Sequence, residues 1–181
     1  MPIKITYFVH GTKTDNEKDI SSGWSDVGLS ELGVNQSIEL KDKILDKKFG
    51  VVISSDLKRA VDSADLTFEK SVPILHDARL RECNYGKYNG KPSEIVEPMQ
   101  EKSIEVRMPE GESYRDVESR MRDFVDYLKK EYDGKSVAIV AHKAPQLALD
   151  VIIKGMTWKE AFTNDWRKTH AWQSGWEYEI G

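Results

Sequence analysis

Hydrophobic positions along the chain fall into short β-rich runs and longer helical stripes that alternate with each other. Residues 3–9, 51–53 and 136–141 are β-rich or apolar runs, and each predicts a buried strand. A brief extended piece at 72–75 and an alternating pattern at 176–180 predict two more. Strands that alternate with helices favour an α/β fold with three layers, α/β/α, around a mainly parallel central sheet.

Apolar residues at helical spacing predict four helices with defined faces. Ser30 is expected to cap the first helix, and Ser113 with Asp116 has the form of a capping box at the third. The stripe of the first helix is Val34, Ile38, Leu40, Ile44 and Leu45. The stripe of the second is Leu57, Ala60, Val61, Ala64 and Phe68. The third carries Tyr114, Val117, Met121, Phe124 and Leu128, and the fourth begins with Leu147, Val151 and Ile152.

Residues 77–111 show no clear periodicity and are rich in glycine and proline. A segment of this length without regular structure is typical of an active-site lid or a small insertion, and we predict one over the active site. The aromatic residues near the end of the chain are expected in the core and in a closing strand. They are Trp166, Trp172, Trp176 and Tyr178.

The composition is that of an ordinary globular protein. The chain has 181 residues, 39% of them hydrophobic, which is the length of a single domain over 1–181. Lys and Arg number 27 and Asp and Glu 31, so the net charge of −4 argues against a nucleic-acid binder. No run approaches the roughly 18 apolar residues of a membrane span. Cys83 is the one cysteine and fits a reducing compartment. We expect a cytoplasmic monomer or homodimer.

Chemically active residues follow three of the predicted strands. His10-Gly11 follows the first, Arg59 lies in the first turn of the helix after 54–55, and His142 follows the strand at 136–141. Ligands of open α/β sheets bind at the carboxyl ends of the strands. An arginine and a helix N-terminus bind anionic tetrahedral groups. A neutral histidine is a competent nucleophile, and a second, cationic one can stabilise a transferring phosphoryl group.

A simpler interpretation applies to each histidine alone. A histidine at one strand end is more often a hydrogen-bonded bystander than a catalyst. Two such histidines near an arginine make a functional site the better hypothesis. His76 and His170 have no comparable setting, and we expect them to be surface or core residues.

Five short segments carry recognisable motifs in a fixed order. They are VHGTKTDN (9–16), SSDLKRAVDSA (54–64), LRECNYGKYNG (80–90), GES (111–113) and VAHK (140–143). In these segments, across nearly its whole length, the chain resembles the histidine phosphatase superfamily, also called phosphoglycerate mutase-like. The resemblance implies a phosphoglycerate mutase-like α/β fold and chemistry that needs no metal or other cofactor.

The resemblance also implies a role for each matching residue. His10 would be the nucleophile that forms a phosphohistidine, and Arg59 would hold the phosphoryl group. His142 would stabilise the phosphoryl group during transfer, and Glu82 would serve as acid for the leaving group and then as base for water. Asn16, in the first motif, would take part in phosphate binding.

The chain departs from the superfamily pattern at the start of the first motif. Val9 occupies the place of an arginine that binds the phosphoryl group. Losing one charge-assisted donor costs about 1.5–3 kcal/mol of binding free energy. Lys13 and Lys143 lie beside the two histidines, and our hypothesis is that one of them compensates as a phosphate-binding residue. The simpler interpretation is that both lysines are solvated.

These residues predict a phosphomonoesterase that acts on a small phosphorylated metabolite. The alternative is a catalytically weak or inactive homologue that binds a phosphorylated ligand or a protein. A phosphoglycerate mutase is disfavoured by the chain length and by Cys83, because mutases commonly have an arginine after the acid. The nucleotide-binding loops G-x-x-x-x-G-K-[ST] and G-x-G-x-x-G are missing. Candidates for substrate contacts are Tyr85, Lys87, Tyr88 and Arg107.

Overall fold

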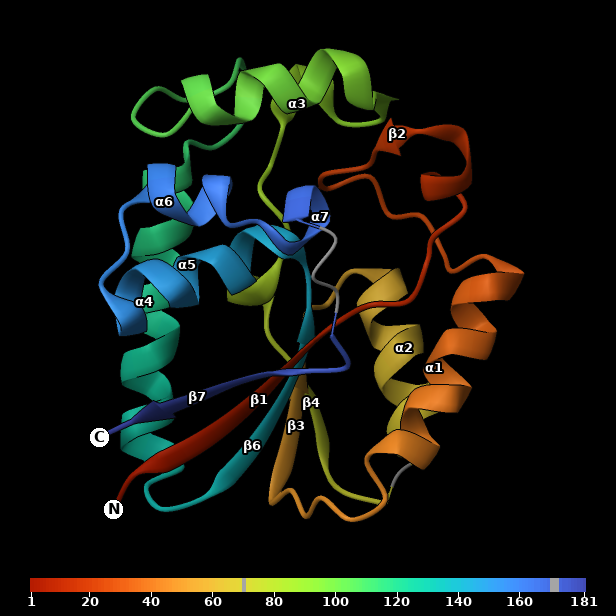
Figure 1. Ribbon diagram of the computed structural model, residues 1–181, viewed down its shortest axis with the longest axis vertical. Helices are drawn as coiled ribbons and strands as arrows, with labels where there is room; N and C mark the ends of the chain where they lie inside the picture. Colours follow the sequence, from red (N-terminus) through yellow and green to blue (C-terminus); the bar gives the residue numbers. More distant parts are fainter. Residues whose placement is uncertain (70, 170–172) are drawn as a thin grey trace.

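The centre of the fold is a five-stranded sheet (Figure 1), in a computed structural model that describes residues 1–69, 71–169 and 173–181. In chain order the strands are β1 (Ile3–Val9), β3 (Val51–Ser54), β4 (Ile74–His76), β6 (Ser136–Ala141) and β7 (Trp176–Ile180). Side by side they follow the order β4-β3-β6-β1-β7. Only the pair β1 and β7 is antiparallel among these neighbours, so the predicted mainly parallel sheet is confirmed.

Helices cover both faces of the sheet, which confirms the three-layer α/β/α architecture. The helices are α1 (Glu31–Lys43), α2 (Lys58–Phe68), α3 (Ser93–Lys102), α4 (Tyr114–Glu131), α5 (Lys143–Lys154), α6 (Trp158–Thr163) and α7 (Trp166–Thr169). Figure 1 shows α1 and α2 on one side of the sheet and α4, α5 and α6 on the other. Beyond the carboxyl ends of the strands lie α3 and the small antiparallel sheet of β2 (Ile20–Ser21) and β5 (Lys91–Pro92). In the described ranges, no helix is long and apolar enough to cross a membrane.

Alternate residues of β1, β3 and β6 enter the cores on opposite faces, because successive side chains of a strand point to opposite sides. In β1, Ile5 and Tyr7 pack into the larger core with α4, α5 and α6. Phe8 packs into the smaller core with α1 and α2. Ile139 and Val140 of β6 divide in the same way. Burial on both faces explains why these strands appear in the sequence as apolar runs.

Two helix caps and two apolar stripes are confirmed. Ser30 Oγ accepts a hydrogen bond from the backbone N of Gly33 at 3.2 Å. Ser113 and Asp116 form the capping box of α4. These bonds satisfy N–H groups that have no partner within the helix. The stripe of α4 is fully buried, and that of α2 is buried apart from Val61, which is half-buried.

The apolar stripe predicted for α1 is correct only in part: Ile44 is buried and Leu40 packs against the smaller core, but two other members are exposed. Ile38 is 47% exposed and Leu45, beyond the end of the helix, is 73% exposed. The face that α1 buries also carries Gly33 and Ser37. Thr67 Oγ1 of α2 donates to the carbonyl oxygen of Ser37 at 2.9 Å, so small residues there permit close backbone packing. Small residues such as these carry no hydrophobic signal, so the periodicity missed this part of the buried face.

The segment 77–111, predicted to be irregular, contains the helix α3 and the short 3-10 helices η2 (Ala78–Leu80) and η3 (Gly86–Tyr88). Pro98 lies inside α3. A proline in a helix interior removes a backbone hydrogen bond and usually marks a helix end. The sequence pattern therefore did not predict α3. The prediction that this segment acts as a lid remains a prediction.

The closing strand β7 and His76, which was expected to have a structural place only, are both described by the structure. Trp176 and Tyr178 are buried in β7, and the rings of Trp166 and Trp176 lie 5.6 Å apart. His76 is exposed, and its Nδ1 lies 2.8 Å from Ser54 Oγ. These residues have the structural places expected of them. His170 and Trp172 lie outside the described residues.

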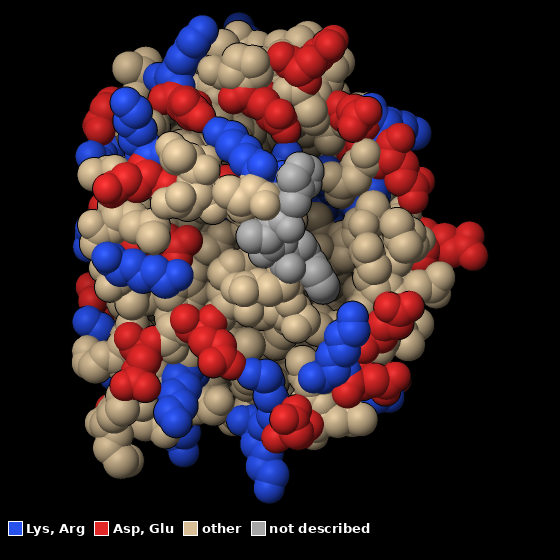
Figure 2. Space-filling model, in the orientation of Figure 1, with Lys and Arg blue, Asp and Glu red and all other residues tan. Residues whose placement is uncertain are grey.

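Charged side chains of both signs are mixed over the face seen in Figure 2. The protein also has ion pairs between segments far apart in the chain, such as Lys41 with Glu69 and Lys47 with Glu177. Exposed pairs of this kind stabilise a protein by at most about 1 kcal/mol each. Ligand binding therefore depends on the local charge at a site rather than on a field of one sign over this face.

Candidate active site

His10 and His142 lie next to each other where two neighbouring strands end. β1 and β6 are parallel, with Val9 in register with Ala141, so the residues that follow them leave the sheet at the same edge. The centroids of the two imidazole rings are 5.1 Å apart. The sheet topology thus brings together two histidines that are far apart in the chain.

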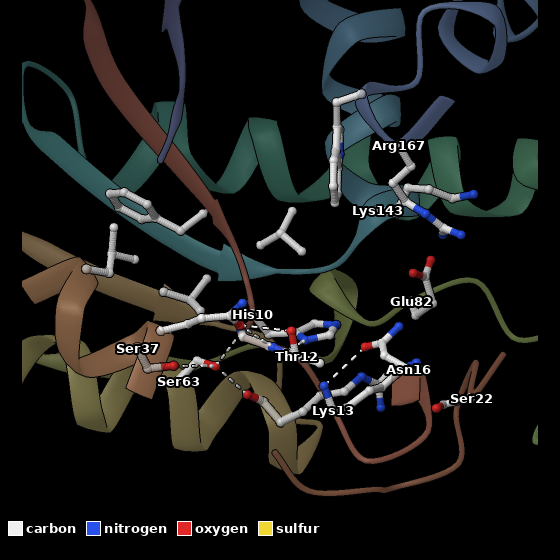
Figure 3. A pocket seen from close by; sticks show the side chains of 18 of the residues that line it. His10, Thr12, Lys13, Asn16, Ser22, Ser37, Ser63, Glu82, Lys143 and Arg167 are labelled. Atoms are coloured by element: carbon white, nitrogen blue, oxygen red, sulfur yellow. Dashed lines mark hydrogen bonds between the residues drawn. The ribbon is translucent and has the colours of Figure 1, made fainter. Parts of the chain in front are cut away.

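A cavity of about 500 Å³ opens beside His10 at this edge (Figure 3). Its volume is in the range of small-molecule sites. The predicted site residues that line it are His10, Lys13, Asn16, Arg59, Glu82 and Lys143. His142 does not line the cavity and is fully buried against His10. Within the described part of the chain, no three His, Cys, Asp or Glu side chains form a group that could hold a metal ion.

A hydrogen bond determines the tautomer of His10. Its Nδ1 lies 2.6 Å from the carbonyl oxygen of Gly11. A carbonyl oxygen only accepts, so Nδ1 carries the proton and Nε2 keeps its lone pair. Burial, followed by the positive charge of Arg59, lowers the pKa of His10 from 6.5 to about 3. At neutral pH His10 is therefore a neutral imidazole, the form that a nucleophile needs.

Close backbone contacts hold the loop after β1 against α1. A Cβ atom on Gly11 would lie 2.4 Å from the carbonyl oxygen of Gly33, and one on Gly33 would lie 1.9 Å from that of Thr12. Such distances are far inside van der Waals contact, so both positions need glycine. The backbone N of Gly11 also donates to Ser63 Oγ of α2 at 3.0 Å. The loop that carries the nucleophile is thus fixed by both helices.

Arg59 is a buried cation at the start of α2, with 1% of its surface exposed. Its Nη1 donates to the carbonyl oxygen of Ser25 at 3.1 Å and its Nη2 to that of Gly23 at 2.7 Å. Its Nε has no hydrogen-bond partner among the described residues. Burial lowers the pKa of Arg59, but a guanidinium stays protonated in proteins. Arg59 is therefore a fixed cation with N–H donors left for an anion.

His142 is held by its backbone and has a free ring. Tyr7 Oη donates to the carbonyl oxygen of His142 at 2.6 Å and accepts from its backbone N at 3.0 Å. Neither ring nitrogen has a partner in the described part of the structure. Burial, followed by the charge of Arg59, lowers the pKa of His142 well below 6.5. With these neighbours the ring is neutral at pH 7 in the protein alone, and the cationic state expected during phosphoryl transfer stays a prediction.

Glu82 has a buried carboxyl group with a fixed orientation. Its Oε1 accepts hydrogen bonds from the backbone N of Cys83 at 2.9 Å and of Ala144 at 3.0 Å. Ala144 belongs to the first turn of α5, so these bonds hold the carboxyl group at the start of that helix. Oε2 accepts no hydrogen bond from the described residues, so this oxygen is available for proton transfer in the cavity.

Lys13 and Asn16 belong to the loop that follows β1. Asn16 Oδ1 accepts a hydrogen bond from the backbone N of Lys13 at 3.1 Å, and Lys13 forms an isolated antiparallel bridge with Leu29. Lys13 Nζ donates to the carbonyl oxygen of Ile20 at 3.3 Å. Burial, followed by the charge of Arg59, lowers the pKa of Lys13 from 10.5 to about 8. Lys13 is still mostly a cation at pH 7.

Lys143 approaches the cavity from the opposite side. Figure 3 shows it beside Arg167, across the cavity from Lys13. Lys143 Nζ donates to Gln100 Oε1 at 2.7 Å and lies 3.5 Å from Asp165 Oδ2. Burial, followed by the charge of Arg167, lowers the pKa of Lys143. The ammonium group thus already has two protein partners.

Arg167 lines the cavity, although no feature of the sequence predicted it as a site residue. It lies in α7, and its Nη2 donates to Glu97 Oε1 of α3 at 2.7 Å. No motif or periodic pattern surrounds it in the sequence. Its place at the cavity follows from the packing of α7 near the carboxyl ends of the strands, which has no local signal.

Of the four residues predicted to contact the substrate, one lines the cavity. Tyr85 lines the cavity, whereas Lys87, Tyr88 and Arg107 do not. Arg107 donates from Nε and Nη2 to the carboxylate of Asp116, at 2.7 Å each. Lys87 pairs with a surface glutamate, and Tyr88 packs against the larger core. The three predictions were wrong because position within a loop does not tell which side faces the cavity.

The match to a known family spans nearly the whole chain. The profile of the histidine phosphatase superfamily, branch 1, matches residues 7–172. This chain belongs to that superfamily. The resemblance seen in its short motifs is thereby confirmed.

Curated relatives in the superfamily include mutases and phosphatases. The 2,3-bisphosphoglycerate-dependent phosphoglycerate mutase 2 of Gloeobacter violaceus is 32% identical over 147 residues, which cover 74% of this chain and 67% of the relative. The fructose-2,6-bisphosphatase TIGAR of Xenopus tropicalis is 32% identical over 134 residues, which cover 68% of this chain and 49% of the relative. The matched part thus spans about half the length of the second relative.

Solved structures of the superfamily share the fold. The alpha-ribazole phosphatase from Shigella flexneri has a TM-score of 0.77 at 20% identity, covering 90% of this chain and 84% of that one. A mycobacterial glucosyl-3-phosphoglycerate phosphatase in complex with VO3 has a TM-score of 0.77 at 24% identity, covering 88% and 85%. At these identities the likeness establishes the fold alone.

Val9 distinguishes this histidine phosphatase-like site from the motif described above. Its side chain lines the cavity and packs against the larger core. It supplies no charge where the motif has an arginine. Cations reach the cavity from other elements, including Arg59 of α2, Lys143 of α5 and Arg167 of α7.

Proposed function

We propose that this protein is a metal-independent phosphomonoesterase that hydrolyses a small phosphorylated metabolite through a phosphohistidine on His10. The observation that carries the proposal is the bond between His10 Nδ1 and the carbonyl oxygen of Gly11, which leaves Nε2 as a nucleophile. Membership of the histidine phosphatase superfamily supports it. The nucleophile, the cations and the acid are all side chains of this chain.

In the first half-reaction, His10 Nε2 attacks phosphorus and the bond from phosphorus to the ester oxygen breaks. Glu82, as a carboxylic acid, gives its proton to the leaving oxygen, so an alcohol departs. The free N–H groups of Arg59 bind phosphoryl oxygens. The negative charge of the phosphoryl group raises the pKa of the His142 imidazole, which lies next to His10 with ring centroids 5.1 Å apart. His142 then takes up a proton and stabilises the transferring group through its positive charge, without lining the cavity.

In the second half-reaction, water replaces His10 on phosphorus. Glu82, now a carboxylate, takes a proton from the water, and the hydroxide attacks phosphorus while the N–P bond breaks. Inorganic phosphate leaves and His10 returns as a neutral imidazole. Glu82 ends as the carboxylic acid that starts the next cycle.

Hydrolysis of p-nitrophenyl phosphate by four proteins tests the proposal. The wild type releases p-nitrophenol, and His10→Ala loses the rate by at least about a thousandfold, because the nucleophile is gone. His76→Ala is the matched control, since this exposed histidine also ends a strand but does not line the cavity, and it keeps the wild-type rate. Glu82→Gln slows mainly the second half-reaction, because p-nitrophenolate leaves without a proton. Acid-labile phosphate therefore accumulates on His10 of Glu82→Gln, measured after rapid quench with labelled substrate.

Equal rates in the wild type and His10→Ala would contradict the proposal. They would favour the alternative, a catalytically weak or inactive homologue that binds a phosphorylated ligand or a protein. The absence of a charge at Val9 motivates that alternative.

A further inference from the structure

The side of the cavity formed by Lys143 and Arg167 has no part in the reaction described above. The ammonium of Lys143 is bound by Gln100 and Asp165, both buried. Arg167 differs, because its ion pair with Glu97 uses Nη2 only and lies at the surface, with side chains 41% and 49% exposed. The backbone N of Arg167 donates to Asp165 Oδ1, but the other guanidinium N–H groups have no hydrogen-bond partner among the described residues. Arg167 is thus the cation on this side that can change partners.

Arg167 lies at the leaving-group side of the cavity. Figure 3 shows it beyond Glu82 as seen from His10, on the side away from Lys13. The charge of Arg167 lowers the pKa of His10 less than the charges of Arg59 and Lys13 do, in agreement with a greater distance. Glu82 protonates the leaving oxygen, so the alcohol part of a substrate must extend past Glu82 towards Arg167.

We propose that Arg167 binds a second anionic group, carried by the alcohol part of the substrate. The proposal deepens the proposed function and rests on it for the direction in which the alcohol lies. The substrate class is then a phosphomonoester with a carboxylate or a second phosphate, since both present the pair of oxygens that a guanidinium binds. The anion takes the place of Glu97 on Arg167, so binding exchanges one charge-assisted partner for another.

The neighbouring residue provides a matched control. Lys168 also lies in α7 and pairs with Glu101 of α3 at 2.7 Å, the same distance as between Arg167 and Glu97. Lys168 does not line the cavity. Replacing Lys168 therefore removes an equivalent link between the same two helices without touching the cavity.

Binding of phosphonates, which are not hydrolysed, tests the proposal. Two pairs of different reach are compared by calorimetry: 3-phosphonopropanoate with propylphosphonate, and 4-carboxybenzylphosphonate with benzylphosphonate. We expect the wild type to prefer the carboxylated member of at least one pair by about tenfold. Arg167→Ala abolishes this preference and keeps the affinity for inorganic phosphate, and Lys168→Ala keeps both. Glu97→Gln increases the preference, because the competing carboxylate is gone.

Three results would overturn the proposal. The first is a wild type without preference in either pair, which includes the case in which none of the phosphonates binds. The second is an equal loss for phosphate and for both members of a pair in Arg167→Ala, which would make Arg167 a ligand of the phosphoryl group. The third is the same loss of preference in Lys168→Ala, which would assign the effect to the contact between α3 and α7. Because no turnover is needed, this outcome is independent of the hydrolysis test for the proposed function.

Discussion

The neutral state of His10 predicts a specific dependence of stability on pH. The pKa of His10 is about 3 in the folded protein and about 6.5 in the unfolded chain. Below pH 6.5 His10 binds a proton in the unfolded chain but stays neutral in the folded protein. The free energy of unfolding therefore falls as the pH falls. One pH unit corresponds to about 1.4 kcal/mol, and pH 5 lies about 1.5 units below 6.5. His10 should therefore cost about 2 kcal/mol of stability between pH 8 and pH 5.

Urea denaturation of the wild type and of His10→Asn, followed by tryptophan fluorescence at pH 8, 6 and 5, measures this contribution. Asparagine is similar in size and does not titrate in this range. The wild type should lose about 2 kcal/mol more than the variant between pH 8 and pH 5, and the difference should vanish above pH 7. His142 titrates with the same sign but is present in both proteins, so it cancels to a first approximation. Parallel losses in the two proteins would refute the neutral state of His10.

Two further variants test the packing around the cavity. Lys143→Met leaves the carboxylate of Asp165, 2% exposed, without its cation, and should lower the free energy of unfolding by about 3 kcal/mol in urea denaturation. Adding Asp165→Asn should recover much of the loss, whereas a cost below about 1 kcal/mol would show that the pair is unimportant. Gly33→Ala puts a Cβ atom 1.9 Å from the carbonyl oxygen of Thr12, so the loop of the nucleophile must shift and kcat for p-nitrophenyl phosphate should fall at least about tenfold. Gly28→Ala, where the nearest atom is 3.6 Å away, is the control, and an unchanged kcat in Gly33→Ala would contradict the close contact.

Local signals made the sheet and most of the site predictable from the sequence. The strands β1, β3 and β6 are buried on both faces and therefore appear as apolar runs. His10 and His142 directly follow two of these strands, and parallel pairing alone brings them together. Arg59 is similarly placed by the short connection between β3 and α2.

Other features depend on contacts that leave no local trace. The buried face of α1 is made by Gly33 and Ser37, whose value lies in their small size rather than in their hydrophobicity. Arg167 reaches the cavity because α7 packs beside α3, and nothing in the surrounding residues indicates this. The neutral state of His142 follows from burial next to Arg59, which a sequence motif cannot report.

The bridge between Lys13 and Leu29 has a consequence for how this fold can diversify. The backbone N of Ser30 donates to the carbonyl oxygen of Thr12 at 2.9 Å beside that bridge, so the chain leaves the nucleophile and returns to α1 at one point. The exposed tip of the loop near Lys18 can therefore lengthen without displacing either end, at about 0.6 kcal/mol for each doubling of loop length. Changes in the length and sequence of this loop tip can therefore alter substrate choice without changing the position of the nucleophile.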